Sequence, residues 1–227
     1  MNSPQLLERA AHAPRRERRK DERPAELLDA ALTLFVEKGY AATRMDDVAA
    51  RAGVSKGTVF LYFPSKLELF KQVVRRNISG RLALWDGRFA DFAGSSAQLL
   101  RLTMLLWWER IGSTPASGIS KLMVSEGQNF PEMAEFFHDE VIVPGQLILR
   151  RLIERGIELG EFRPVCVEHA VQGVVSVMVL LALSRQSRNA CTQNFMALDP
   201  VAYLNAHAEL IARGLAAAPA PAQESAR

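Results

Sequence analysis

The sequence predicts an all-α protein with a small N-terminal helical domain and a larger C-terminal helical domain. The 227 residues include 11 prolines and 14 glycines, and the turn-forming clusters lie far apart, which favours helices over many short strands. Apolar residues recur at helical spacing along much of the chain. With 48% hydrophobic residues, the chain can bury a sizeable core.

Charge is distributed unevenly between the two parts. Residues 1–80 hold 15 Lys and Arg against 10 Asp and Glu, a net charge of +5, whereas residues 81–227 hold 13 against 15. A basic N-terminal third on a near-neutral body indicates a polyanion as the partner of that third. Residues 1–20 end in a basic run and predict a flexible arm, which is either a solvated tail or a segment that contacts DNA phosphates or a minor groove.

The first helix that the sequence clearly predicts spans Pro24–Lys38. Proline suits the first helical turn, where its missing N–H is not needed, and Gly39 is a typical C-terminal stop. One apolar stripe runs along this segment and predicts its buried face: Leu27, Leu28, Ala31, Leu34 and Phe35.

Two short helices are expected next, joined by a glycine-containing turn. Thr43 is placed to cap the first of them, which ends at Gly53 after about two turns. Ser55 is placed to cap the second. With the first helix packed on them, these two short helices follow the helix-turn-helix plan.

The helix expected over Lys56–Phe63 has an unusual exposed face. Val59 and Phe63 share one face and should pack inward, which turns Phe60 and Leu61 toward the outside. Apolar side chains there suit contact with thymine methyl groups in a major groove. The alternative is that both pack against neighbouring helices.

A long helix starting at Lys66 and running toward Trp85 and Phe89 should join the two domains, and the body should be helical throughout. Pro144 is expected to break the third body helix, and the Ala- and Pro-rich residues 216–227 are expected to be disordered. The body helices are expected near Ser96–Ile111, Pro115–Glu126, Pro131–Glu158, Val165–Arg185 and Pro200–Leu215.

The segment Gly39–Lys66 closely resembles the DNA-binding signature of the TetR (tetracycline repressor) family, with Gly53-Val54-Ser55-Lys56-Gly57 and Tyr62-Phe63 in the same order and spacing. The resemblance implies a helix-turn-helix domain over residues 21–68 and a ligand-binding and dimerisation domain over residues 69–215. Phe60 departs from the tyrosine common in the family, so a phenol hydrogen bond is absent there. The residues that the resemblance places at the DNA surface are Thr43, Arg44, Ser55, Lys56, Gly57, Thr58, Phe60, Tyr62 and Lys66.

The segment Val165–Arg185 is apolar nearly all round, so it must be covered on both sides. The resemblance supplies a reason, because in this family the last two long helices pair with their copies in a four-helix interface. The residues expected to dimerise are Val167, Val171, Val174, Val175, Met178 and Leu181.

The resemblance also implies a ligand cavity in the body, although aromatic and methionine residues at helical spacing are more often plain core. The expected lining is Trp85, Phe89, Met104, Trp107, Trp108, Met123, Phe137 and Met178, with Phe92 and Phe130 as further candidates. Polar contacts could come from Arg110, Glu126, Gln128 and His138. Asp139 and Glu140 follow His138 directly, and adjacent helix positions do not face one site, so no metal or cofactor is expected.

Enzyme signatures are absent from the sequence: there is no phosphate-binding glycine loop, nucleophile elbow or paired-carboxylate motif. Cys166 and Cys191 are expected to be reduced thiols, and the apolar run Val171–Leu183 is shorter than a membrane span needs. We therefore expect a cytoplasmic regulator with no membrane partner. Its expected form is a homodimeric repressor that binds a palindromic operator and is released by a small hydrophobic or amphipathic ligand.

Two other functions remain open from the sequence. The protein could activate transcription or act without a ligand, or it could sequester a small molecule with a DNA-binding domain that no longer works.

Overall fold

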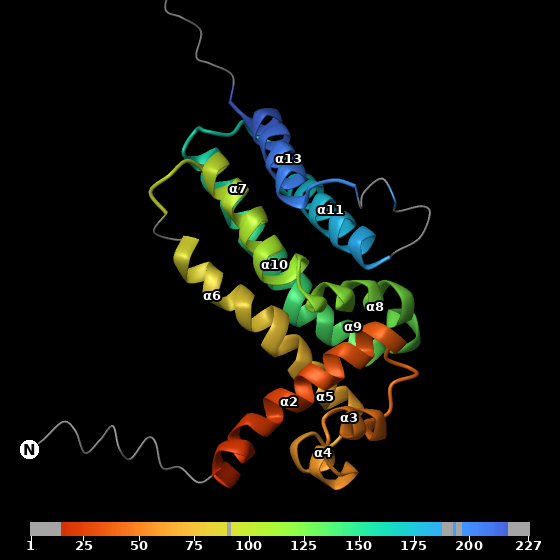
Figure 1. Ribbon diagram of the computed structural model, residues 1–227. Helices are drawn as coiled ribbons and strands as arrows, with labels where there is room; N and C mark the ends of the chain where they lie inside the picture. The colour runs from red at the N-terminus through yellow and green to blue at the C-terminus, as the bar shows by residue number, and fades with distance from the viewer. Residues whose placement is uncertain (1–14, 90–91, 188–192, 194–196, 218–227) are drawn as a thin grey trace, which may run out of the picture. The chain divides into compact units, whose positions relative to one another are not determined.

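The computed structural model describes residues 15–89, 92–187, 193 and 197–217, and for residues 15–22 and 86–89 it describes the backbone alone (Figure 1). Within these residues the protein is helical, and extended backbone pairs only in an isolated bridge between Phe162 and Ala216. The all-α prediction is confirmed. The chain forms two compact units, which divide between Val73 and Val74.

The first unit contains α2 (Arg15–Lys38), α3 (Met45–Arg51), α4 (Lys56–Tyr62) and most of α5 (Lys66–Val74). The second unit continues the chain with α6 (Gly80–Phe89), α7 (Ser96–Trp107), α8 (Gly118–Glu126), α9 (Pro131–Phe137), α10 (Val143–Glu158), α11 (Val167–Gln186) and α13 (Pro200–Leu215). Its short segments are η1 (Arg75–Ser79), η2 (Trp108–Gly112), η3 (Pro115–Ser117), η4 (Gly127–Asn129) and η5 (His138–Ile142).

The first unit packs around the stripe of α2 that the sequence predicts. Leu27, Phe35 and Val48 are buried, as are Val59 of α4 and Phe70 of α5. The rings of Phe35, Tyr40 and Phe70 contact one another, with centroids 5.5–5.7 Å apart. Gly39 ends α2 with φ +87°, a conformation that residues with a side chain rarely adopt.

The α2 helix begins earlier than the sequence predicts. The expected start at Pro24 is wrong, because the helix begins at Arg15 and contains Pro24. The residues before Pro24 are mostly Arg, Lys and Glu, which are strong helix formers, so one missing N–H does not set the boundary. The basic residues 15–20 are therefore helical, and residues 1–14 of the expected arm lie outside the described residues.

The second unit has its core among four long helices. In Figure 1, α7, α10, α11 and α13 run alongside one another, and each packs against at least two of the others. Arg155 of α10 fixes the start of α7 by donating to Ser96 Oγ at 2.7 Å and to the Gly94 carbonyl at 2.9 Å. The most buried core residues are Leu99, Leu100, Met104, Ile153, Val174, Leu181 and Leu204.

Three π-helical segments, η1, η2 and η5, interrupt the helices of the second unit. The break expected near Pro144 is found as η5, directly before Pro144 in the first turn of α10. Proline has no N–H, and its ring crowds the carbonyl of the preceding turn, so the regular ladder is interrupted there. Of the two cysteines, Cys166 is an exposed free thiol, and Cys191 lies outside the described residues, as do residues 218–227 of the expected tail.

The helix α11 is longer than the apolar run that the sequence analysis considered. By length and composition alone its 20 residues could cross a membrane, whereas the run Val171–Leu183 within it is shorter than a membrane span needs. The core helix of a soluble protein passes the same test, and α11 packs against α8, α10 and α13. Its apolar composition is accounted for in part by this packing.

Gly156 of α10 supports the close approach of the segment that follows the helix. Its carbonyl oxygen accepts hydrogen bonds from the Glu161 and Phe162 amides, both at 2.9 Å, and a Cβ at this position would overlap the buried Phe162 ring. We predict that Gly156→Ala lowers the free energy of unfolding by about 1–3 kcal/mol, because an overpacked core must shift. Urea denaturation followed by circular dichroism measures this change.

The double variant Gly156→Ala/Phe162→Leu is the control, since the smaller side chain makes room for the added methyl. It should lose less stability than the two single variants summed. Strict additivity would show that the ring is not what the methyl meets.

Candidate DNA-binding surface and ligand cavity

The helix α4 is held by a cap that the sequence predicts. Ser55 Oγ accepts a hydrogen bond from the Thr58 amide at 3.2 Å and lies 2.9 Å from the Thr58 hydroxyl. The turn before it needs Gly53, whose φ is +65°. Val59 and Phe63 are buried as predicted, so α4 has one face inside the unit and one face outside.

The outer face of α4 combines polar, open and apolar positions. Ser55, Lys56 and Gly57 are exposed at its N-terminal end, and a Cβ on Gly57 would meet nothing closer than the Ser55 hydroxyl, at 3.8 Å. Phe60 is 40% exposed and Leu61 is 77% exposed. The sequence analysis noted Leu61 as outward-facing without including it among the DNA-binding residues, and its exposure makes it an additional candidate.

Two exposed cations belong to the same unit. Arg44 is exposed at the N-cap of α3, where its backbone N–H donates to Asp47 Oδ2 at 3.4 Å. Lys56 Nζ lies 3.0 Å from the Asp46 carboxylate, and both side chains are more than half exposed. An exposed pair of this kind contributes little to stability, so a phosphate can compete with Asp46 for the ammonium group.

Thr43 has a different position from the one expected. Only 1% of it is exposed, and its hydroxyl donates to the Gly39 carbonyl at 2.7 Å, with the Leu34 carbonyl 3.2 Å away. The N-cap of α3 is Arg44, so Thr43 does not cap that helix. The hydroxyl is occupied within the unit and cannot offer itself to a phosphate, because a buried polar group must keep its partners.

Lys66 is likewise occupied within the unit. Its Nζ donates to the carbonyls of Tyr40 at 2.7 Å, Thr43 at 3.0 Å and Ala41 at 3.3 Å, and it lies 4.4 Å from the Tyr40 ring centroid. These contacts tie the start of α5 to the turn between α2 and α3. The expected role of Lys66 as a cation for phosphate is replaced by one that positions the turn.

An ion pair joins α2 to α3 on the surface of the same unit. The Arg51 guanidinium donates to both carboxylate oxygens of Glu37, at 2.6 and 3.2 Å. These hydrogen bonds lower the pKa of Glu37 below its ordinary value. Because both groups are exposed, the pair fixes geometry more than it adds stability.

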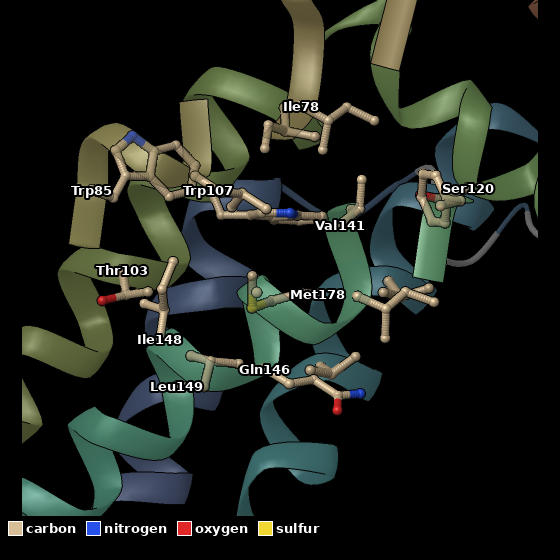
Figure 2. Close-up of a pocket in the computed structure, with 17 residues that line it drawn as sticks. Ile78, Trp85, Thr103, Trp107, Ser120, Val141, Gln146, Ile148, Leu149 and Met178 are labelled. Atoms are coloured by element: carbon tan, nitrogen blue, oxygen red, sulfur yellow. The ribbon is translucent and has the colours of Figure 1, made fainter. Parts of the chain in front are cut away.

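The second unit contains a cavity of about 140 Å³ between α6, α7, α8, α9, α10 and α11. Figure 2 shows the Trp107 indole edge-on, between Ile78 above it and Met178 below it. Each of the three π-helical segments contributes to the wall, through Ile78, Ile111 and Val141. Among the residues that the structure describes, none of those lining the cavity is charged.

Half of the ligand-binding residues expected from the sequence line this cavity: Trp85, Trp107, Phe137 and Met178. Met104, Trp108 and Met123 do not line it, and the two former are buried in the core. The Phe89 side chain lies outside the described residues. The other candidates are not part of the lining either: Phe92, Phe130, Arg110, Glu126, Gln128 and His138.

The expected dimerisation residues are mostly core. Val171, Val174, Met178 and Leu181 are buried within one chain, so those four cannot form an interface. The expected stripe faces α8, α10 and α13 because α11 has to fill the middle of its own unit. Val167 and Val175 are half-buried, and Val175 lines the cavity.

The helices α11 and α13 also have outward faces, which we call together the α11/α13 face. On α11 they carry Gly173, Ser176 and the 47% exposed Leu180. On α13 they carry Ala202, Ala206 and the 65% exposed Leu210. Helical spacing puts each set of three on one side of its helix.

Metal ligands do not gather anywhere in the part of the chain that the structure describes: it contains no group of three His, Cys, Asp or Glu side chains suited to a metal ion. His138 Nδ1 lies 2.9 Å from Asp139 Oδ1, a contact between two adjacent exposed residues.

Comparison with known proteins identifies the family. Residues 27–73 match the family model described as bacterial regulatory proteins, tetR family. The transcriptional regulator YfiR of Bacillus subtilis (strain 168), of the HTH type, is 32% identical over 149 residues, which are 64% of this chain and 71% of YfiR. The HTH-type transcriptional activator FasR of Mycolicibacterium smegmatis is 49% identical over 59 residues, which cover only 26% of this chain and 27% of FasR.

The fold extends over both units. The transcriptional regulator FadR from Bacillus subtilis, solved in complex with stearoyl-CoA, aligns with 84% of this chain and 98% of its own, with a TM-score of 0.59 and 19% identity. At that identity the likeness shows the fold alone. With the helix-turn-helix unit, these matches place the chain in the TetR family of bacterial transcriptional regulators, which are DNA-binding proteins and not enzymes.

Proposed function

We propose that the protein is a cytoplasmic repressor that binds a palindromic operator as a homodimer and is released by a small apolar ligand. The observation that carries the proposal is the outer face of α4, where Lys56 and the open Gly57 backbone adjoin exposed Phe60 and Leu61. Cations and open backbone hold phosphates, while apolar side chains suit base edges.

In this proposal the first unit binds DNA by placing α4 in the major groove. Lys56 and Ser55 lie at the N-terminal end of the helix, which is the end that reaches base edges and backbone in this motif. Arg44, at the start of α3, is exposed and can bind a phosphate. Thr43 and Lys66 shape the surface from within.

A dimer is supported by the α11/α13 face. Large exposed apolar side chains on two packed helices favour a covering partner. A second copy satisfies this need and also supplies the second recognition helix that a palindromic operator requires.

Ligand response is supported by the continuity of the chain between the two units. From Lys66 to Phe89 the backbone is one helical run of α5, η1 and α6. Ile78, Leu82 and Trp85 on this run line the cavity. A ligand that contacts them acts on the segment that leaves the DNA-binding unit, so both sites can bias one element.

Activation of transcription is the second candidate function, and FasR, an activator, supports it. A reporter fused to the regulated promoter separates the two in a strain that lacks the protein. Higher expression there indicates a repressor, and loss of expression indicates an activator.

We predict that Arg44→Ala weakens binding to the operator about tenfold and reduces the slope of log affinity against log salt by about 1, because one phosphate contact is lost. Titration of a duplex selected from a random pool, at several salt concentrations, measures both quantities. Arg110→Ala is the matched control, since Arg110 is an exposed arginine of the second unit whose guanidinium lies 3.3 Å from the neighbouring Glu109 carboxylate. Equal losses in the two variants would refute the assignment.

Lys66→Met should destabilise the first unit by about 1–3 kcal/mol, because the carbonyls of Tyr40, Ala41 and Thr43 lose their charged donor. DNA affinity should fall with it. Lys56→Ala should weaken DNA binding while changing stability by no more than about 0.5 kcal/mol. Thermal unfolding followed by circular dichroism, together with DNA titration, tests the contrast, and an unchanged melting curve for Lys66→Met would count against a positioning role.

The double variant Leu180→Glu/Leu210→Glu is expected to be monomeric, because it puts carboxylates into the centre of the α11/α13 face. Light scattering after gel filtration should report the mass of one chain, and affinity for a palindromic duplex should drop at least a hundredfold. Val124→Glu, at a more exposed apolar position on α8, should leave the dimer intact. A dimeric double variant would place the interface elsewhere.

A further inference from the structure

We propose that the cavity of the second unit selects an uncharged, mainly apolar ligand about the size of one aromatic ring, and that it rejects carboxylates, phosphates and ammonium groups. The inference rests on the proposed function, in which this cavity is the effector site, and it names the chemistry of the effector.

Few side chains in the cavity wall can form hydrogen bonds with a ligand. Thr103 reaches the wall, but its hydroxyl already donates to the Leu99 carbonyl at 2.8 Å. Ser120 and Gln146 are the remaining side chains of the lining that carry a hydroxyl or an amide, and both are half-buried. Trp85 and Trp107 add one indole N–H each. A ligand can therefore form a few neutral hydrogen bonds, while an ion would lose its hydration without a compensating charge.

Charged groups lie in a separate groove beside the cavity. Leu82 and Ile148 border both the cavity and this groove, which holds Arg75, Asp139 and Glu140. Arg75 Nη2 donates to Glu140 Oε1 at 2.9 Å, so its charge is balanced within the protein. An anionic ligand in the cavity would have two apolar side chains between itself and a guanidinium that is already paired.

The volume of the cavity and the side chains of its wall determine the size and the aromatic character of the ligand. A dry apolar cavity of about 150 Å³ is known to hold benzene, and this cavity has a volume of about 140 Å³. Trp85, Trp107 and Phe137 offer ring faces and edges, against which a flat ring packs favourably. Met178 adds a polarizable sulfur, which fits around such a ring.

Intrinsic fluorescence provides a direct assay. The three tryptophans of the chain are Trp85, Trp107 and Trp108, all in the second unit, and the first two line the cavity. Two isosteric pairs of probes isolate charge from shape: benzamide against benzoate, and benzyl alcohol against benzylammonium. We expect the neutral member of each pair to bind the full-length dimer at least tenfold more tightly than its charged partner at pH 7.

Val175→Phe locates the binding, because a larger side chain on the cavity wall should abolish the response to the neutral probes. Val124→Phe, on the exposed surface of α8, should leave the response unchanged. Circular dichroism shows whether each variant is folded. If Val175→Phe does not fold, Ser120→Phe can replace it, because Ser120 lines the same cavity from another helix.

Three outcomes would overturn the inference. Benzoate or benzylammonium binding as tightly as its neutral partner would show that the cavity accepts charge. Displacement of benzamide by stearoyl-CoA, the ligand of the FadR structure, would show the same for a long anionic thioester. If no probe binds and stearoyl-CoA also fails, the cavity is not an effector site, and the ligand part of the proposed function fails with the inference while DNA binding stands.

Discussion

The hydrogen bonds from Lys66 to the turn between α2 and α3 are the interaction on which the DNA-binding unit depends. The carbonyls of Tyr40, Ala41 and Thr43 lie outside any helix, and without a donor they would have to stay in contact with water. One ammonium group satisfies all three, and the buried Thr43 hydroxyl satisfies the Gly39 carbonyl behind them. The turn, α3 and the start of α5 are thereby fixed together, so α4 can present exposed side chains on a rigid support.

The cavity depends on a different feature, which is the presence of glycine at the end of two π-helical segments or directly after them. A Cβ on Gly112 would lie 2.8 Å from the Trp107 ring and 2.6 Å from the Trp108 ring, so the missing side chain lets both indoles pack over η2. A Cβ on Gly80 would lie 2.7 Å from the Arg75 carbonyl oxygen, across the wide turn of η1. Both segments contribute an isoleucine to the cavity wall. Irregular helix geometry therefore contributes to the shape of the cavity together with the apolar side chains.

Local patterns predicted the fold well, and long-range partners explain where they failed. Val59 and Phe63 were placed inward because helical spacing alone decides which face of α4 is apolar. Lys66 was placed at the DNA surface because the sequence does not show that a turn 23–26 residues earlier in the chain needs its donors. Thr43 was placed there because the sequence does not show that its hydroxyl donates to the Gly39 carbonyl. Val171 and Val174 were assigned to a dimer because a helix apolar on all sides does not reveal which side its own chain covers. Trp107 and Met178 were predicted for the cavity, but Gln146 and Ile78 were not. Gln146 does not stand out from an ordinary helix surface, and the buried Ile78 does not stand out from an ordinary core position.

The size of the cavity limits how the proposed switch can work. A ligand shifts a conformational equilibrium only by the difference in its affinity for the two states, and moving a population from 1:99 to 99:1 requires about 5.5 kcal/mol. A ring-sized ligand in about 140 Å³ has few atoms, and the best small ligands gain no more than about 1.5 kcal/mol per heavy atom in total affinity, of which only a part distinguishes the states. A homodimer carries two such cavities, so two ligands can combine their effect on one pair of DNA-binding units. In the proposed dimer the two cavities would share the free energy needed to move one pair of DNA-binding units, so pairing would serve release as well as binding.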